Sequence, residues 1–197
     1  MSAPDQKDVL HRYLSQGREV LRWKLEGLGE YDARRPVTPT GTNLLGLVKH
    51  LAIIDSGYFG EVFDRPFGET VGWFEAHTEP DADMWATAEE TREGVLGLYA
   101  RAAEHSDATI AELDLDSPGR VPHWPDDRAE VTLGHMLVHV ATETHRHAGH
   151  ADICRELVDG AVGLRPDRPN LGGNRAARLL GHRARLEREA RRAAGTA

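Results

Sequence analysis

The chain has 197 residues, enough for one domain with a hydrophobic core of its own, and its net charge of −8 argues against a nucleic-acid partner. A single cysteine, Cys154, excludes an internal disulfide framework and fits a reducing compartment. Because the N-terminus lacks the pattern of a signal peptide and no uncharged apolar run approaches the roughly 20 residues that span a bilayer, we expect a cytoplasmic protein with no membrane partner.

The first predicted helix runs from about Asp5 to Leu28. Leucines recur there at spacings of 3, 4 or 7 residues, and a glycine completes the stripe: Leu10, Leu14, Gly17, Leu21, Leu25 and Leu28. Residues 30–41 contain two prolines and a glycine and predict a loop. Thr42 or Asn43 then caps a second helix, which extends to about Phe63 and places His50 among apolar residues.

Residues 64–85 form the longest predicted connection. They are rich in proline, glycine and aromatic residues, including Trp73 and Phe74, and they have no long period. We expect a crossover that packs on the bundle and shapes a cleft, with the character of a lid. Thr87 followed by Glu90 is a capping-box pattern, which predicts a third helix to about Leu113.

A second loop, residues 114–130, leads into the fourth predicted helix, which runs from about Val131 to Val158 and stops at Gly160. No segment predicts a strand. Four long helices with a crossover between the second and the third favour an all-α four-helix bundle over residues 1–165.

Residues 166–197 are expected to form a C-terminal extension. The stretch from Asn174 onward carries seven arginines against two glutamates. It predicts an exposed helix that packs on the bundle or frays from it, with a phosphate or an anionic lipid as an alternative contact.

The fourth helix carries the residues most suited to chemistry, because five of the eleven histidines lie between His135 and His150. At 100° per residue, Glu143 and His147 fall in the middle of its apolar face, where a carboxylate is costly unless it is paired or bound to a cation. In a bundle, His50 of the second helix can meet this pair. His139 and His150 lie nearer the edge of the stripe.

Two imidazoles and a carboxylate are ligands that zinc accepts at about 2 Å. Spacing alone leaves plainer alternatives open. A lone histidine on an apolar helix face, such as His50, is more often a core residue with a satisfied hydrogen bond. Glu143 with His147 is equally compatible with a simple surface ion pair.

Three segments resemble a known family: LEGLGEYDARRPVTPTG, GTNLLGLVKHLAIIDSGYF and HMLVHVATETHRHAGHADICRELVDG. The resemblance is to the DinB-like metalloprotein superfamily, in the branch of mycothiol-dependent maleylpyruvate isomerases and mycothiol S-transferases, and it covers about residues 5–175. It implies a four-helix bundle with a divalent metal held by His50, Glu143 and His147. It also implies that His139, one turn earlier, is not a ligand.

Such a donor set leaves one position open on a tetrahedral metal, and a thiol bound to a dication is deprotonated near neutral pH. The resemblance implies that the thiol is mycothiol and that it attacks a small electrophile, as a transferase or an isomerase. The expected nucleophile is therefore this exogenous thiol or a metal-bound water and not a side chain. Zinc is the expected metal, while nickel, iron and manganese are compatible.

Other residues near the predicted site have secondary roles. His139 and His150 are expected to orient ligands or to contact the cosubstrate. Arg146 and Arg155 flank the site and are candidates to bind a substrate carboxylate, with surface ion pairing as the plainer reading. Cys154 lies on the same stripe about 10 Å from His147 along the axis, which favours a buried structural cysteine over a ligand or a nucleophile.

Two other functions remain open from the sequence. One is a metal-binding bundle without turnover that serves as a stress-response or interaction protein. The other is a hydrolase that uses the open coordination position to activate water. A homodimer formed through helix faces is left open as well.

Overall fold

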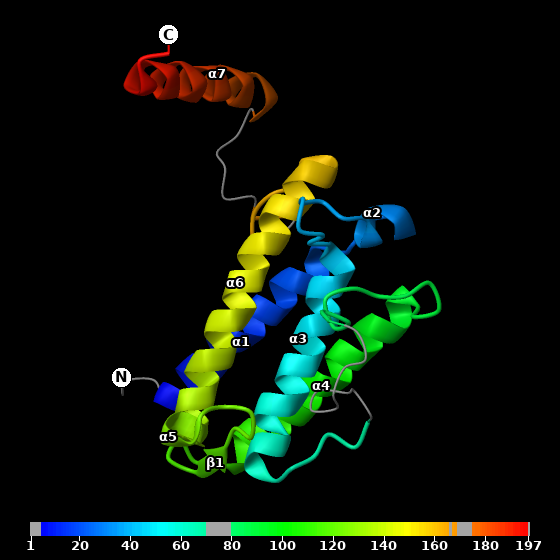
Figure 1. Ribbon diagram of the computed structural model, residues 1–197, viewed down its shortest axis with the longest axis vertical. Coiled ribbons are helices and arrows are strands. Elements are labelled where there is room, and N and C mark those ends of the chain that lie inside the picture. The colour runs from blue at the N-terminus through cyan, green and yellow to red at the C-terminus, as the bar shows by residue number, and fades with distance from the viewer. Residues whose placement is uncertain (1–4, 70–79, 166, 169–174, 197) are drawn as a thin grey trace. The chain divides into compact units, whose positions relative to one another are not determined.

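The computed structural model describes residues 5–69, 80–165, 167–168 and 175–196 (Figure 1). The chain forms two compact units, residues 1–161 and 162–197. The long helices of the first unit are α1 (Gln6–Trp23), α3 (Leu44–Phe59), α4 (Arg92–Glu112) and α6 (Leu133–Asp159). α1 packs on α6, α3 packs on α4, and α3 also packs on α6, so the predicted all-α bundle is confirmed.

Side-chain caps explain where these helices begin and end. Asn43 accepts a hydrogen bond from the backbone N–H of Gly46 at 2.7 Å and so caps α3, as the sequence predicts. Gly160, at φ 77°, ends α6 in the left-handed conformation that glycine favours. The capping box of Thr87 and Glu90 forms its reciprocal hydrogen bonds, but α4 begins later, at a cap formed by Thr91.

Short elements occupy the connections between the long helices. They are α2 (Glu30–Arg34), the 3-10 helix η1 (Glu61–Phe63), β1 (Pro118–Arg120), α5 (Asp126–Ala129) and β2 (Glu130–Thr132). Two further boundary predictions were also wrong. α1 ends at Trp23, five residues early, and the predicted second helix divides at Gly60 into α3 and η1.

The prediction of no strands was also wrong. β1 and β2 pair antiparallel, with Gly119 opposite Val131. Each strand has only three residues, too few to show alternation in the sequence. Gly119 lies so close to Phe63 and to the carbonyl of Val62 that a Cβ atom there would meet both within 3 Å, so tertiary packing stabilises this hairpin.

Close contact between α1 and α6 depends on Gly17, which the sequence places on the buried stripe. A Cβ atom at Gly17 would lie 2.8 Å from the methyl group of Thr144. Leu14 and Leu21, on the same stripe, are fully buried. α1 and α6 can therefore approach each other closely at Gly17, because this residue of α1 has no side chain.

Residues 81–86, which we call the strap, run along α3. Lys49 donates hydrogen bonds to the carbonyls of Ala82 and Trp85 at 2.9 and 3.0 Å, and Asn43 donates to the carbonyl of Met84 at 3.1 Å. The predicted cleft-forming aromatic residues Trp73 and Phe74 lie outside the described residues.

The second unit contains α7 (Arg175–Ala194), the helix that the sequence predicts in the Arg-rich extension. It exposes Leu179, Leu180 and Leu186 and carries an ion pair between Arg191 and Glu187. Its packing on the bundle stays a prediction. Across the described ranges, no helix combines the length and the apolar character needed to cross a membrane.

Candidate metal centre

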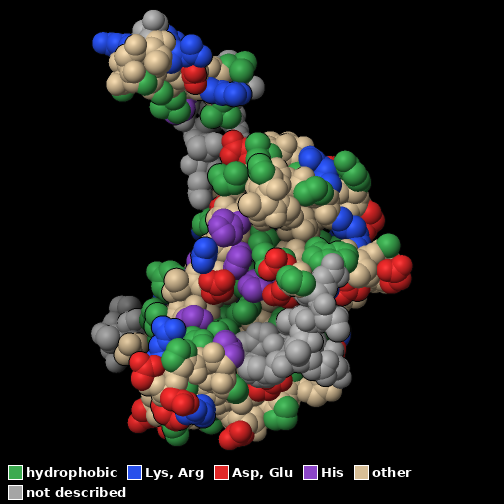
Figure 2. Space-filling view, viewed as in Figure 1, with side chains coloured by type: hydrophobic (Ala, Val, Ile, Leu, Met, Phe, Trp, Pro, Cys, Tyr) green, Lys and Arg blue, Asp and Glu red, His purple; other side chains and the backbone are tan. Residues whose placement is uncertain are grey.

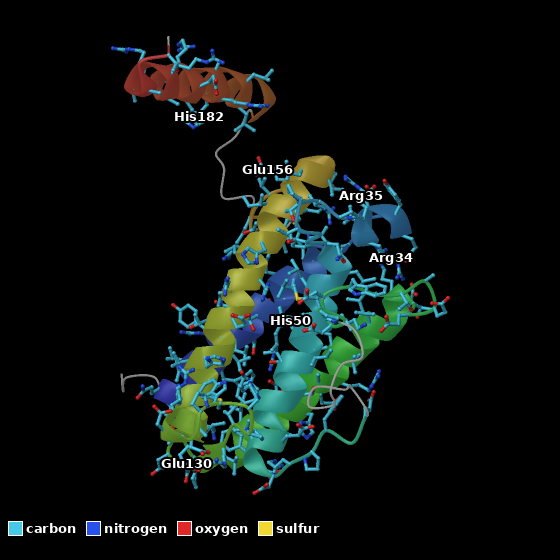
Figure 3. The ribbon with its side chains drawn as sticks, in the orientation of Figure 1. Arg34, Arg35, His50, Glu130, Glu156 and His182 are labelled. Atoms are coloured by element: carbon cyan, nitrogen blue, oxygen red, sulfur yellow. The ribbon has the colours of Figure 1, made fainter. Side chains whose placement is uncertain are left out.

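The three predicted ligands converge although they come from two helices. His50 belongs to α3 (Figure 3), and Glu143 and His147 belong to α6. One ligand atom from each lies within 4.8 Å of the other two. Nε2 of His147 is 2.9 Å, and Nε2 of His50 is 3.8 Å, from Oε1 of Glu143. Ligands about 2 Å from a tetrahedral ion lie about 3.3 Å apart, and the two distances to Glu143 lie on either side of this value.

The charge state of the cluster also suits a metal. Burial lowers the pKa of His147, and the neighbouring His50 lowers it further, so the His147 imidazole is neutral at neutral pH. Burial acts to raise the pKa of Glu143, but His147 and His50 outweigh it, and the pKa lies below its usual value. A neutral imidazole beside an ionised carboxylate is the protonation state that metal binding requires.

Asp83 is a site residue that sequence reasoning missed. Its Oδ2 lies 2.6 Å from Nδ1 of His50, the ring nitrogen that does not face Glu143. Asp83 belongs to the strap, which has no periodic pattern, and 33 residues separate it from His50. The only signal for this contact in the sequence is a carboxylate within the crossover, and no local pattern indicates that it contacts a histidine.

The two edge histidines of α6 have different surroundings. The Nδ1 atoms of His150 and His147 are 3.2 Å apart, so His150 adjoins a predicted ligand. His139 packs its ring against Tyr58 and Trp124, with centroid distances of 4.9 and 5.1 Å, and burial lowers its pKa. Figure 2 shows histidine side chains in a row on one face of the first unit.

The two arginines differ as well. Arg146 is exposed, and its Nη1 lies 4.0 Å from Oε2 of Glu143. Arg155 is buried, and it donates hydrogen bonds to the carbonyls of Lys24 and Glu26 and to the carboxylate of Asp159. These partners tie the segment after α1 to the end of α6, so the structure engages the Arg155 guanidinium in structural contacts.

Cys154 is buried, as expected. It is a free cysteine with 1% of its surface exposed, and it packs in the core cluster with residues of α1 and α3. Burial raises the pKa of its thiol, which makes it a poor nucleophile.

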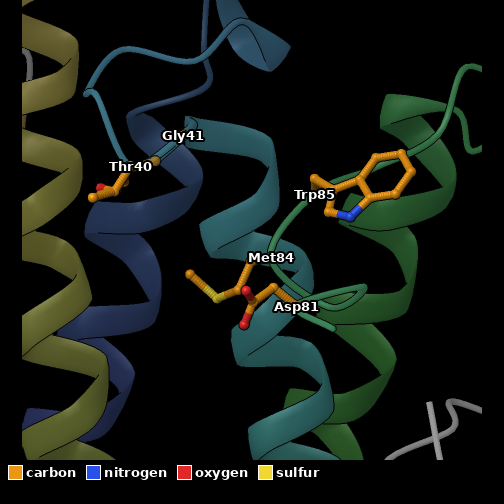
Figure 4. A pocket seen from close by; sticks show the side chains of 6 residues that line it. Thr40, Gly41, Asp81, Met84 and Trp85 are labelled. Atoms are coloured by element: carbon orange, nitrogen blue, oxygen red, sulfur yellow. The ribbon is translucent and has the colours of Figure 1, made fainter. Parts of the chain in front are cut away.

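A pocket of about 470 Å³ lies between the strap and the loop before α3 (Figure 4). Its lining residues are Thr40, Gly41, Thr42, Asp81, Met84 and Trp85. The side chains of Met84 and Asp81 point to one side of the strap, and the Trp85 indole points to the other. Because Asp83 lies between Asp81 and Met84, the segment that contacts His50 also borders this pocket.

Comparison with known proteins identifies the family. Residues 9–160 match the family model described as mycothiol-S-transferase. A comparison with curated proteins finds no match. The family match covers more than half of the chain. It includes α3, α4 and α6 and all but the first three residues of α1. His50, Glu143 and His147 lie within it. The chain therefore belongs to the mycothiol S-transferase family, in agreement with the resemblance noted in its sequence.

Proposed function

We propose that the protein joins mycothiol to small electrophilic molecules at a metal centre held by His50, Glu143 and His147. The convergence of two imidazoles and one carboxylate from α3 and α6 carries the proposal, together with the family match. When bound there, a divalent metal lowers the pKa of a coordinated thiol, so that the thiolate is available near neutral pH. Zinc suits this donor set best, and nickel, iron and manganese also accept it.

The protein's own residues set the charge and the shape of the centre. His50 and His147 present Nε2 atoms toward Glu143, and the single negative charge of Glu143 offsets half the charge of a dication. The centre would therefore keep a net positive charge that attracts an anionic sulfur. No side chain of the cluster is a nucleophile, so the attacking sulfur belongs to the cosubstrate.

The reaction forms a bond between the mycothiol sulfur and an electrophilic carbon. In a substitution, the leaving group departs with its bonding electron pair. In an isomerisation, the sulfur adds to a C=C double bond and the π electron pair moves onto the conjugated carbonyl. After rotation about the resulting single bond, the pair returns, the thiolate leaves and the double bond re-forms, so mycothiol is regenerated. We propose that His150 orients His147 and that His139 and Arg146 contact the bound molecules, since His150 and Arg146 adjoin the ligands and His139 lies one turn away on α6.

The test is metal analysis and thiol consumption with protein purified without a histidine tag. We expect about one divalent metal per chain, lost in His147→Ala, and mycothiol consumption with a chlorinated arene or maleylpyruvate that is lost with the metal. Arg146→Ala, a change at an exposed side chain of the same helix, should keep the metal.

Three outcomes would contradict the proposal in different ways. Equal metal content in the parent protein and in His147→Ala would show that the proposed residues do not hold the metal. Bound metal without thiol consumption across the panel would indicate a non-catalytic metal-binding protein. Turnover that does not need a thiol would indicate a hydrolase.

A further inference from the structure

We infer that Asp83 is a positioning residue, which fixes the tautomer and the ring orientation of His50 so that Nε2 faces the metal position. The inference rests on the proposed function, because it concerns a predicted ligand. Its basis is the 2.6 Å contact between Oδ2 of Asp83 and Nδ1 of His50. The two side chains are only 14% (His50) and 23% (Asp83) exposed, so the contact is partly shielded from water.

The direction of this hydrogen bond follows from the chemistry of the two groups. An ionised carboxylate accepts hydrogen bonds and cannot donate them, so the proton must lie on Nδ1 of His50. In a neutral ring, Nε2 then keeps its lone pair, and Nε2 is the atom that faces Glu143 at 3.8 Å. An acceptor behind a metal-binding imidazole commonly holds the ring and selects its tautomer in this way.

Asp83 can act as an orienting group because other residues hold the strap in place. Lys49 bonds the carbonyls of Ala82 and Trp85, on either side of Asp83, and Asn43 bonds the carbonyl of Met84. Lys49 is itself held by Glu90, at 2.8 Å. The backbone around Asp83 is therefore attached to α3 without any help from His50.

Consecutive residues of α3 thus contact one segment in different ways. Lys49 donates a hydrogen bond to the backbone of the strap, and Nδ1 of His50 donates one to the carboxylate of Asp83. A shift of the strap along α3 would move the acceptor away from Nδ1 and allow the ring to turn. We conclude that the strap is part of the metal centre although none of its residues belongs to the ligand cluster.

The first test is the tautomer of His50 in the metal-free protein, measured from the ring nitrogen shifts in a long-range ¹H–¹⁵N correlation spectrum. In the parent protein we expect the proton on Nδ1. Asp83→Ala removes the acceptor, so the tautomer with the proton on Nε2 should become populated. Asp83→Asn keeps an oxygen acceptor of the same shape and should restore the Nδ1–H tautomer.

The second test is zinc affinity, measured by competition with a chromophoric chelator. Asp83→Ala should bind zinc 10- to 100-fold more weakly than the parent, and Asp83→Asn should lie between them because it restores orientation without charge. Asp81→Asn, at an exposed carboxylate of the same strap, should match the parent.

An unchanged tautomer in Asp83→Ala, or zinc affinity equal to that of the parent, would overturn the inference. If Asp83→Ala does not fold, Asp83→Asn still decides the question, because a protein in which Asn fails to keep the Nδ1–H tautomer contradicts it. A parent protein that binds no zinc would refute the proposed function instead, while the tautomer measurement would still report on Asp83.

Discussion

Gly46 of α3 lies directly against the backbone carbonyl of Met84 in the strap, so closely that a Cβ atom on Gly46 would overlap the Met84 oxygen. Gly46 and His50 are four residues apart and share a face of α3. The strap therefore reaches the metal centre along a strip of helix that a side chain at position 46 would obstruct.

Replacement of Gly46 by alanine should consequently weaken metal binding. The added methyl group displaces Met84 and its neighbours, and Asp83 moves away from His50. We expect about a 10-fold or greater loss of zinc affinity by chelator competition. The matched control is Gly149→Ala in α6, where a Cβ atom meets nothing within 4 Å and should stabilise the helix by up to about 1 kcal/mol. Equal zinc affinity in the two variants would contradict the prediction.

A second prediction concerns the buried ion pair of Arg18 and Asp55, which joins α1 to α3 at 2.7 Å with each side chain 2% exposed. Asp55→Ala removes the buried partner of the guanidinium and leaves it only the half-exposed Asp107, 2.6 Å from Nη1. The free energy of unfolding should therefore fall by about 3 kcal/mol in a urea titration. The double variant Arg18→Met with Asp55→Ala should recover much of the loss. If the double variant is less stable than Asp55→Ala alone, the cost does not arise from the loss of a buried partner for the Arg18 charge.

Cys154→Ala should retain thiol transfer. The thiol is buried, its pKa is raised by burial, and the proposed nucleophile is exogenous. In the native parent protein a thiol-specific chromogenic reagent should leave Cys154 unmodified, and in urea it should titrate one thiol per chain. Loss of transfer activity in a Cys154→Ala protein with normal metal content would instead make Cys154 part of the chemistry.

Stability toward acid should depend on Asp159. The hydrogen bond from Arg155 holds the pKa of Asp159 below its usual value. In the unfolded chain the pKa of aspartate is about 3.9. The contact therefore stabilises the fold fully above about pH 4, and the stabilisation is lost as the pH falls through the lower pKa of the folded state.

The measurement is the difference in unfolding free energy between the parent protein and Asp159→Asn, followed from pH 6 to pH 2. The difference should be constant near neutral pH and should shrink below about pH 4. In an Arg155→Met background the same substitution should show a much weaker dependence on pH. A difference that does not change with pH in the parent background would refute the role of this ion pair.

Local patterns predicted the parts of the site that lie within one helix. Glu143 and His147 are four residues apart, so any helix places them on one face, and their 2.9 Å contact needs no tertiary information. The caps at Asn43 and Gly160 and the buried Gly17 also follow from short-range rules. The meeting of His50 with this pair was predicted on the assumption of a bundle, and the packing of α3 on α6 brings it about.

The sequence by itself determined the four long helices, the polar residues on their buried faces and the family, because each depends on periodicity, spacing or motif within one segment. Only the tertiary structure decided the β1–β2 hairpin, the structural contacts of Arg155 and the position of Asp83 behind His50. These features join segments that are distant in the sequence and have no period of their own. Their positions depend on which helix surfaces pack together, and Gly46 shows the reason: the path of the strap is set by where another helix leaves room for its backbone.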